Sequence, residues 1–492
     1  MERFRFSLPP LSTPGEVSSF YSHQDGCGRS MALAHLAALL AGGQRAATPV
    51  LMVDWNLEAP RLHHYFPRQD DGPGVLELFE ACRAALRGRQ DAGRDSAAVA
   101  HEVLEAVGWE QYVCRVDESR PLYLLRAGRQ DASYTRRLVD MHWDELFNAC
   151  PALFRCFAAS LGRHFRHVLV DSCSGRADMA GICTTLLPTR LVLAFPPGRQ
   201  HLDGLTALLQ RATTYRRSHE DEQRPLLAYP LPIRGGRDDA GQRTLWRRGD
   251  QARAVPGYQP LFERALGEAY GIAGLSLESY FDEVQLPPLR DTGGAAPALS
   301  VAGGDHFSLL RVLGVFREWL GGGHAPWQSR AEIPLQEAIA AARQGMREGG
   351  AAVSLPLAHS LERLGGVYCQ ENRLWQALQC LQESRTLLLR LLGAEHPDTR
   401  RCTRSLAALL ERQGRPDEAR RLQDAAAAWS AVHDEGLHSV GEEGERRHRV
   451  LNVQQERRGY HLNCLDGPAL PWAGALPEAG LQEASARHAK VG

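Results

Sequence analysis

The stretch FYSHQDGCGRSMALAHLAALLA, from Phe20 to Ala41, decides how the first part of the chain folds. It reads as the end of a strand, a loop containing Gly26 and Gly28, and then an unbroken amphipathic helix. This is the order of a phosphate-binding loop, in which backbone N–H groups and the positive end of the helix approach phosphate oxygens. The stretch therefore predicts an ancestral nucleotide site.

Short apolar runs alternate with helical patterns from about residue 20 to residue 320. Buried parallel strands have this composition, so the alternation predicts a doubly wound, mostly parallel α/β sheet with ligands at the carboxyl ends of its strands. Polar candidates follow three of the apolar runs, at residues 26–30, 54–58 and 171–175. The predicted strands lie within residues 48–56, 120–128, 167–172, 189–197 and 224–232.

Composition narrows the classes of partner. The chain has 57 basic and 58 acidic residues and a formal net charge of −1, which gives no global attraction to nucleic acid or to anionic membranes. The 11 cysteines form no C-x-x-C pair, and no run of about 18 uncharged apolar residues is present, so a reduced cytoplasm is expected. Lys490 is the single lysine, an arginine bias that is typical of a GC-rich bacterial genome.

Three segments resemble a bacterial branch of the MinD/ParA-type P-loop ATPases. FYSHQDGCGRS is similar to the family's KGGVGRT loop, VLMVDWNLEAP to its DWDLEAPG segment, and HVLVDSCSG to its Walker B strand and switch. The three follow one another in the family's order over residues 16–320. The resemblance implies a P-loop NTPase fold, ATP and Mg²⁺ as cofactors, and a homodimer as a possible state of this unit.

The resemblance also assigns roles to residues. Ser30 would bind Mg²⁺, with Asp54 and Asp171 as the catalytic carboxylates that hold the metal shell. Arg29 stands where the P-loop lysine belongs, and its planar guanidinium is wider than an ammonium group. The residues expected to contact the nucleotide are Gln24, Asp25, Gly26, Cys27, Gly28, Arg29 and Ser30.

Three departures from the family pattern predict a weakened ATPase. Gln24 aligns with the signature lysine, and Asp25 aligns with a glycine. A carboxylate about 5 Å from a phosphate oxygen costs on the order of 3 kcal/mol at an effective dielectric near 20. Asn56 aligns with the aspartate that helps to place the attacking water, and an amide cannot accept the proton of that water.

A second pattern begins near Glu332. Aligning Ala377 with Ala419 gives a period of 419 − 377 = 42 residues, and Leu364 then aligns with Leu406. These paired helices resemble tetratricopeptide repeats of the kinesin-light-chain type, with residues 332–349 as the second helix of a degenerate preceding repeat. A plain helical bundle that caps the first domain is the alternative interpretation.

The expected organisation is an N-terminal extension at residues 1–15, the P-loop domain at 16–320, a linker at 321–331 and the repeats at 332–430. A partly disordered tail is expected at residues 431–492, with the apolar segment 460–472 as a candidate docking segment.

We therefore predict a cytoplasmic regulatory or scaffold protein that binds a protein partner through its repeats and neither nucleic acid nor membrane. Relatives with this fusion resemble signalling or defence components. The alternative is an active ATPase switch that dimerises on ATP and controls a partner. Chromosome partitioning is disfavoured because neither a helix-turn-helix signal nor a basic stripe is present.

Overall fold

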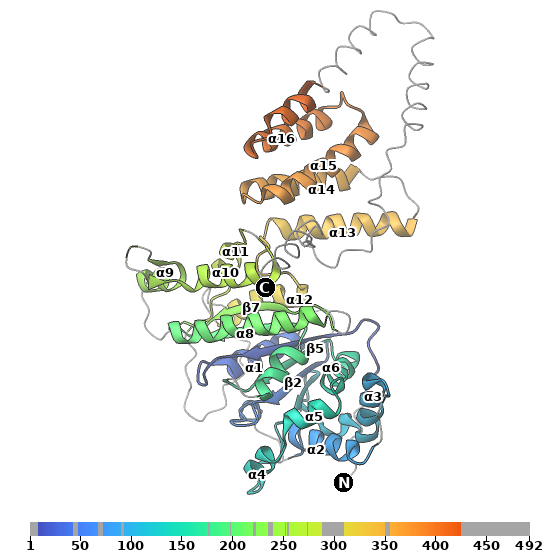
Figure 1. Ribbon diagram of the computed structural model, residues 1–492, viewed down its shortest axis with the longest axis vertical. Coiled ribbons are helices and arrows are strands. Elements are labelled where there is room, and N and C mark those ends of the chain that lie inside the picture. The colour runs from blue at the N-terminus through green and yellow to red at the C-terminus, as the bar shows by residue number, and fades with distance from the viewer. Residues whose placement is uncertain are drawn as a thin grey trace, which may run out of the picture. The chain divides into compact units, whose positions relative to one another are not determined.

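The computed structural model divides the chain into two compact units, Met1–Gln328 and Ser329–Gly492 (Figure 1). The described residues are 8–42, 48–66, 72–89, 93–175, 178–196, 198–219, 223–234, 240–250, 252, 255–272, 274–287, 309–349 and 355–424. The candidate docking segment at 460–472 and the rest of the predicted tail lie outside them.

The first unit is built on a seven-stranded sheet of order β3-β4-β2-β5-β1-β6-β7. All neighbouring strands are parallel except β3 and β4, which are antiparallel. In Figure 1 the sheet runs through the middle of this unit, with helices on both sides of it. This topology confirms the predicted doubly wound, mostly parallel sheet of a P-loop NTPase. Its strands are β1 (Glu16–Tyr21), β2 (Val50–Trp55), β3 (Val113–Asp117), β4 (Leu122–Leu125), β5 (His167–Ser172), β6 (Arg190–Phe195) and β7 (Leu227–Pro232).

The strands are apolar because the sheet is buried. Every residue of β2 and of β7 is buried, which explains why both read as continuous apolar runs. The edge strand β3 is half-buried and carries charged side chains, so its sequence lacks that signal. A short hairpin, β8 (Gly249–Asp250) with β9 (Val255–Pro256), lies outside the main sheet.

Helix α1 (Arg29–Ala41) follows the glycine loop as predicted, but it is not amphipathic. Its alanines and all but one of its leucines are buried, because α1 packs both on the sheet and against α12. The other helices of this unit are α2 (Val75–Leu86), α3 (Ser96–Val107), α4 (Tyr134–Val139), α5 (Trp143–Ala149), α6 (Leu153–His164), α7 (Asp178–Gly181), α8 (Arg199–Ser218), α9 (Ala240–Arg248), α10 (Tyr258–Tyr270), α11 (Glu278–Glu283) and α12 (Leu309–Gly322). Short helical turns occur at Leu62–Tyr65 and Trp109–Tyr112, and a π-helical turn at Ile182–Leu186.

The second unit is all helical. It contains α13 (Glu332–Gly349), α14 (Leu355–Gln370), α15 (Leu374–Leu392) and α16 (Pro397–Arg412), and residues 416–424 are helical as well. Consecutive helices pack pairwise around one apolar core that includes Leu335, Leu361, Leu381 and Leu406. Ala377 and Ala419, the residues that defined the repeat period, are both fully buried. The close approach of α14 and α15 explains Gly365, where a Cβ atom would lie 2.7 Å from the Leu381 side chain.

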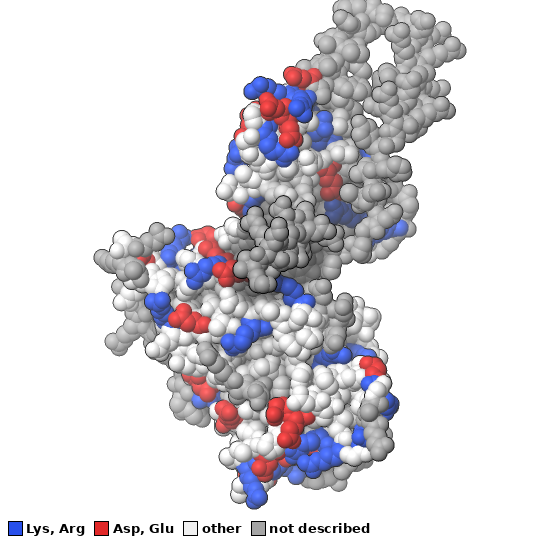
Figure 2. All heavy atoms as spheres, viewed as in Figure 1, with Lys and Arg blue, Asp and Glu red and all other residues white. Residues whose placement is uncertain are grey.

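None of the described helices is long and apolar enough to cross a membrane. On the face shown in Figure 2, basic and acidic side chains are interspersed among the coloured residues of both units, without a continuous basic stripe.

Candidate functional site

The glycine loop has the backbone conformation of an anion-binding turn. Gly26 and Gly28 have φ values of 81° and 90°, in the left-handed region that favours glycine. A Cβ atom on Gly26 would meet nothing within 4 Å, so backbone conformation and not crowding requires the glycine. Gly28 is also the N-cap of α1, which has no side-chain cap, so the first N–H groups of this helix have no side-chain acceptor there.

Arg29 points into the protein. Its Nε donates to Asp171 Oδ1 at 2.6 Å, and its side chain is only 3% exposed. Its Nη1 donates to Ser22 Oγ at 2.9 Å and to Ser174 Oγ at 3.1 Å. The guanidinium therefore connects the end of β1 with the end of β5 and the loop that follows, and the sequence predicted none of these bonds.

Asp171 is fully buried, and both of its carboxylate oxygens accept hydrogen bonds. Oδ1 accepts from Arg29, and Oδ2 accepts from Ser30 Oγ at 2.5 Å. The predicted phosphate-loop hydroxyl and the predicted Walker B carboxylate are therefore in direct contact. A short hydrogen bond from a hydroxyl to a carboxylate is among the stronger kinds in proteins.

Asp54 lies beside Asp171, because the two residues are register partners on β2 and β5. Each is the second-to-last residue of its strand, whereas the sequence placed them just after the strands. Asp54 Oδ2 accepts from the backbone N–H groups of Arg61 and Leu62 at 3.2 and 3.0 Å, while its buried Oδ1 has no hydrogen-bond partner among the described residues. Burial, and then the neighbouring charge of Asp171, raise the pKa of Asp54 to about 8.

The altered loop residues form a second set of contacts. Asp25 Oδ1 accepts from Ser174 Oγ at 2.6 Å and lies 4.0 Å from Arg29 Nη2, with half of the Asp25 side chain exposed. The Gln24 carbonyl accepts from Ser22 Oγ at 2.9 Å. The charge on Asp25 is therefore paired within the loop region, which the count of charges in the sequence did not predict.

The Asn56 side chain is hydrogen-bonded within its own turn. Its side-chain amide donates to the Ala59 carbonyl at 2.8 Å, and the residue is 2% exposed. The Asn56 side chain therefore stabilises the loop after β2.

The sequence did not predict two serines of the site. Ser22 and Ser174 are polar residues in loops after β1 and β5, where serine is common, so only their distance from Arg29 reveals them. Tyr21 Oη donates to the Gly175 carbonyl at 2.7 Å and adds a further link between the same two loops. Cys27, by contrast, is half-buried in the loop, and no hydrogen bond or ion pair of its thiol is present among the described residues.

The donor set suits a hard cation. Ser30, Asp54 and Asp171 bring one hydroxyl and two carboxylates together at the carboxyl ends of β2 and β5, and Mg²⁺ prefers oxygen ligands. The buried Asp54 Oδ1 without a partner fits such an ion, because a cation would satisfy that oxygen and replace its proton. These three residues would hold the metal.

Comparison with known proteins gives matches for both units. A family model of the tetratricopeptide repeat matches residues 356–428. The α/β unit is similar to solved structures of an ATP complex of McdA from Cyanothece (13% identity, 63% of this chain, 98% of that chain, TM-score 0.39) and a ParA family ATPase from Chlorobium tepidum (15%, 62%, 97%, TM-score 0.35). It is also similar to the cell division ATPase MinD from Pyrococcus furiosus (16%, 62%, 99%, TM-score 0.32). No curated protein sequence matches the chain.

The match over residues 356–428 confirms the predicted tetratricopeptide repeats. The sheet order and the glycine loop, rather than the low overall likeness, establish the fold class of that unit. The chain therefore joins a P-loop NTPase fold to a tetratricopeptide-repeat unit.

Proposed function

We propose that this chain is a regulatory or scaffold protein of a signalling or defence system, in which the repeats bind a protein partner and the nucleotide site is degenerate. ATP and Mg²⁺ are its expected ligands, held weakly. The proposal places the protein in the cytoplasm, with a homodimer through the α/β unit as an accessible state and no role for nucleic acid or membrane.

The observation that carries the proposal is the set of bonds made by Arg29. A P-loop cation serves catalysis by binding phosphate oxygens, but the Nε and Nη1 groups of Arg29 are used by Asp171, Ser22 and Ser174. Binding phosphate through these groups requires at least one buried, charge-assisted bond to break. Asn56 adds to this, because no carboxylate stands at its position to orient a water.

An active ATP-dependent switch is the second candidate, because parts of the site are intact. Gly26 and Gly28 keep the left-handed conformations of a phosphate-binding turn. The unpartnered Asp54 Oδ1 and the contact between Ser30 and Asp171 suit a bound metal ion. These features support retention of nucleotide binding more than retention of hydrolysis.

Turnover of ATP by the purified protein separates the two candidates. We expect the protein to release phosphate at steady state no faster than a Ser30→Ala variant. This variant is the matched control, because it removes the hydroxyl that donates to Asp171. Calorimetry with a non-hydrolysable ATP analogue and Mg²⁺ would show independently whether nucleotide binds. Turnover typical of P-loop switches that is abolished by Ser30→Ala would contradict the degenerate site and favour the switch.

A further inference from the structure

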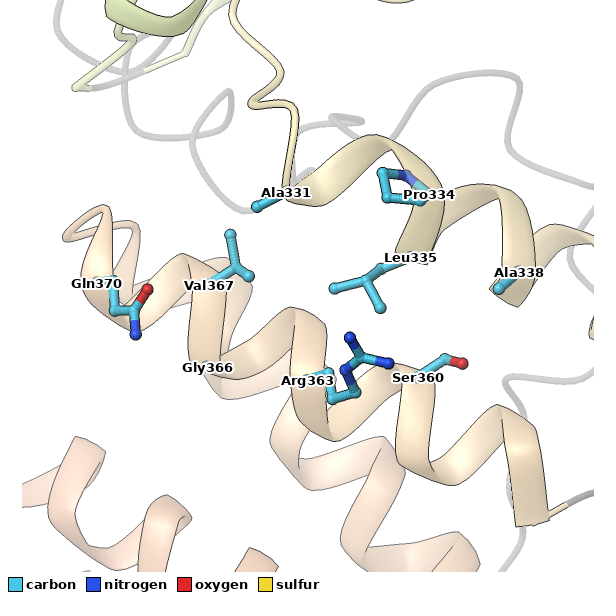
Figure 3. Close-up of a pocket in the computed structure, with 9 residues that line it drawn as sticks. All are labelled: Ala331, Pro334, Leu335, Ala338, Ser360, Arg363, Gly366, Val367 and Gln370. Carbon is cyan, nitrogen blue, oxygen red and sulfur yellow. The ribbon is translucent and has the colours of Figure 1, made fainter.

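A groove of about 540 Å³ lies between α13 and α14, within the repeat unit (Figure 3). Pro334, Leu335 and Ala338 line it from α13, and Ser360, Arg363 and Val367 line it from α14. Figure 3 shows the Leu335, Arg363 and Val367 side chains projecting into the space between the two helices. Arg363 is the only charged residue among those that line the groove.

The repeat period identifies α13 as the second helix of a preceding repeat. Adding 42 to 335, 339, 342 and 346 gives 377, 381, 384 and 388, which are four buried positions of α15. On α13 the corresponding residues are Leu335, Ile339, Ala342 and Met346, and all four belong to the core of the repeat unit or pack against it. The pair α13 and α14 is therefore equivalent, one repeat earlier, to the pair α15 and α16.

The equivalent groove one repeat later is filled. Adding 42 to Ser360 and Val367 gives Cys402 and Leu409 on α16, which are 0% and 1% exposed. Helix α14 lies against α16 there, through an ion pair between Glu362 and Arg401 at 2.8 Å and a contact between His359 and Asp398 at 3.2 Å. The groove between α13 and α14 is thus the position that the first helix of the preceding repeat would occupy.

The chain's own candidate for that position is used elsewhere. That candidate is α12, which lies one repeat period before α14 in the sequence. Its residues Phe316 and Trp319 precede Ala358 and Leu361 of α14 by 42 residues. In the structure Phe316 and Trp319 are fully buried in the α/β unit, where Trp319 Nε1 donates to Glu283 at 3.2 Å. Helix α12 also ends at Gly322, 42 residues before the core residue Leu364, so it is too short to serve as a complete first helix.

The groove carries a charge at one position where its filled counterpart carries none. Position 363 is arginine, whereas the equivalent position 405 is serine. Arg363 is exposed, and none of the described residues forms an ion pair with it. A helix that lies in this apolar groove would therefore gain from a carboxylate near Arg363.

We propose that the groove binds an amphipathic, acid-bearing α-helix of a partner protein, which takes the place of the missing first helix. The apolar face of the partner helix packs on Leu335 and Val367, and its carboxylate pairs with Arg363. The inference rests on the proposed partner-binding role of the repeats and names the site and the chemistry of that binding.

A peptide of residues 355–370 that carries Arg363→Glu is the probe, because α14 is the helix that fills the equivalent groove and the substitution makes the peptide acidic. We expect saturable binding to the full-length chain by fluorescence anisotropy. A photoreactive group on the peptide should crosslink to residues 331–338 and 360–370.

In the full-length chain, Val367→Asp should weaken peptide binding at least tenfold, because it places a charge in the apolar groove. Arg363→Glu should weaken it about fivefold, as expected for a partly exposed ion pair. Arg404→Glu, an exposed arginine on α16 outside the groove, is the matched control and should leave affinity unchanged. Circular dichroism and melting temperature would verify that each variant is folded.

The inference is overturned if the peptide fails to bind, or binds with equal affinity to the groove variants. A photoreactive residue at position 367 of the full-length chain would test other occupants: crosslinks within one chain to residues 425–492, or between two copies, would also overturn the partner assignment. Loss of peptide binding together with retained partner capture by the repeats would reject this groove alone and leave the proposed function standing.

Discussion

Arg29 shows how one side chain can alter a site while the fold around it is kept. A lysine at this position would offer a single point charge, whereas the fork of arginine offers several donors in fixed directions. Those donors match Asp171, Ser22 and Ser174, which lie on two neighbouring strands or in their loops. Ser174 in turn donates to Asp25, so the glycine loop and the loop after β5 are bonded to each other.

We predict that Asp25→Gly raises affinity for a non-hydrolysable ATP analogue with Mg²⁺ about tenfold. At 5 Å a unit charge costs on the order of 3 kcal/mol near a dielectric of 20, but Asp25 is half exposed and solvent screens part of that. Titration calorimetry would measure the change.

Asp25→Asn is the control for this experiment, because it removes the charge and keeps an acceptor for Ser174. If both variants bind the ATP analogue more tightly, the charge of Asp25 is the obstacle. If only Asp25→Gly binds it more tightly, the obstacle is the backbone geometry of the loop. Unchanged affinity in both would contradict an electrostatic role for Asp25.

We predict that Asp54→Asn stabilises the protein at pH 8 and not at pH 4. Between its ordinary pKa near 4 and its raised pKa of about 8, the folded state keeps a proton on Asp54 that the unfolded state releases. The free energy of unfolding contributed by this group therefore falls as pH rises through that window and is constant above it. Asparagine does not titrate, so its melting temperature should exceed that of the wild type by several degrees at pH 8.

Melting curves from pH 4 to pH 9 would test the Asp54 prediction, and Asp203→Asn, at an exposed position of α8, would serve as the comparison. Millimolar Mg²⁺ should raise the melting temperature of the wild type more at pH 8.5 than at pH 6, since the cation competes with the proton. Parallel pH profiles for wild type and Asp54→Asn would contradict the raised pKa.

At the scale of elements, buried strands were predictable and the half-buried edge strand β3 was not. The five predicted strands all exist as β2, β4, β5, β6 and β7, because burial on both faces leaves a continuous apolar run in the sequence. Strand β3 was missed, since an edge strand with Arg115 and Asp117 carries no such run. Helix α1 was placed correctly but judged amphipathic, because sequence periodicity does not show that α12 covers its outer face.

For the candidate site, the sequence predicted which residues come together but not how all of their side chains are bonded. The sequence brings Ser30, Asp54 and Asp171 together, because strand order places their positions at one edge of the sheet. It does not give the direction of the Arg29 side chain, which depends on two serines more than 140 residues apart in the chain, Ser22 and Ser174. Contacts of this kind leave no periodic signal.

Within the repeats, a buried polar cluster fixes the first helix. Glu332, 1% exposed, accepts from Tyr368 Oη at 2.8 Å, from Gln336 at 2.6 Å and from Arg373 at 2.6 Å. The Arg373 guanidinium lies 4.2 Å from the centre of the Tyr368 ring. The cluster joins α13 to α14 and to the start of α15.

We predict that Arg373→Ala lowers the stability of the repeat unit by about 3 kcal/mol, because it leaves the Glu332 carboxylate buried without its cation. Calorimetry of the full-length chain should show the transition of the repeats shifted down and that of the α/β unit unchanged. The double variant Glu332→Gln, Arg373→Met should recover part of the loss. A single transition that moves as a whole would contradict independent units.

At the scale of the whole molecule, the two units carry different kinds of evidence for function. The α/β unit keeps its sheet and bonds Arg29 of its glycine loop to Asp171, whereas the repeat unit keeps its helical register and carries an open groove. Partner binding by repeats needs surface and no chemistry, so the second unit is the one expected to determine what the protein does.

We predict that removal of residues 329–492 abolishes partner co-purification, while Ser30→Ala leaves it largely intact. Quantitative mass spectrometry of tagged protein and both variants would measure this, and circular dichroism would confirm that residues 1–328 remain folded. The opposite pattern, with capture lost on Ser30→Ala and kept after the deletion, would restore the ATP-switch interpretation.

The junction between the units is short. Tyr229 Oη donates to the His324 carbonyl at 3.0 Å, and the Tyr270 and Trp327 rings lie 4.8 Å apart, so the chain is anchored to the α/β unit through Trp327. Ser329 then bonds Glu332 at the start of α13. Few residues separate the two anchors, so a protein bound to the repeats, as proposed, would stay joined to the nucleotide-binding unit through a short covalent tether.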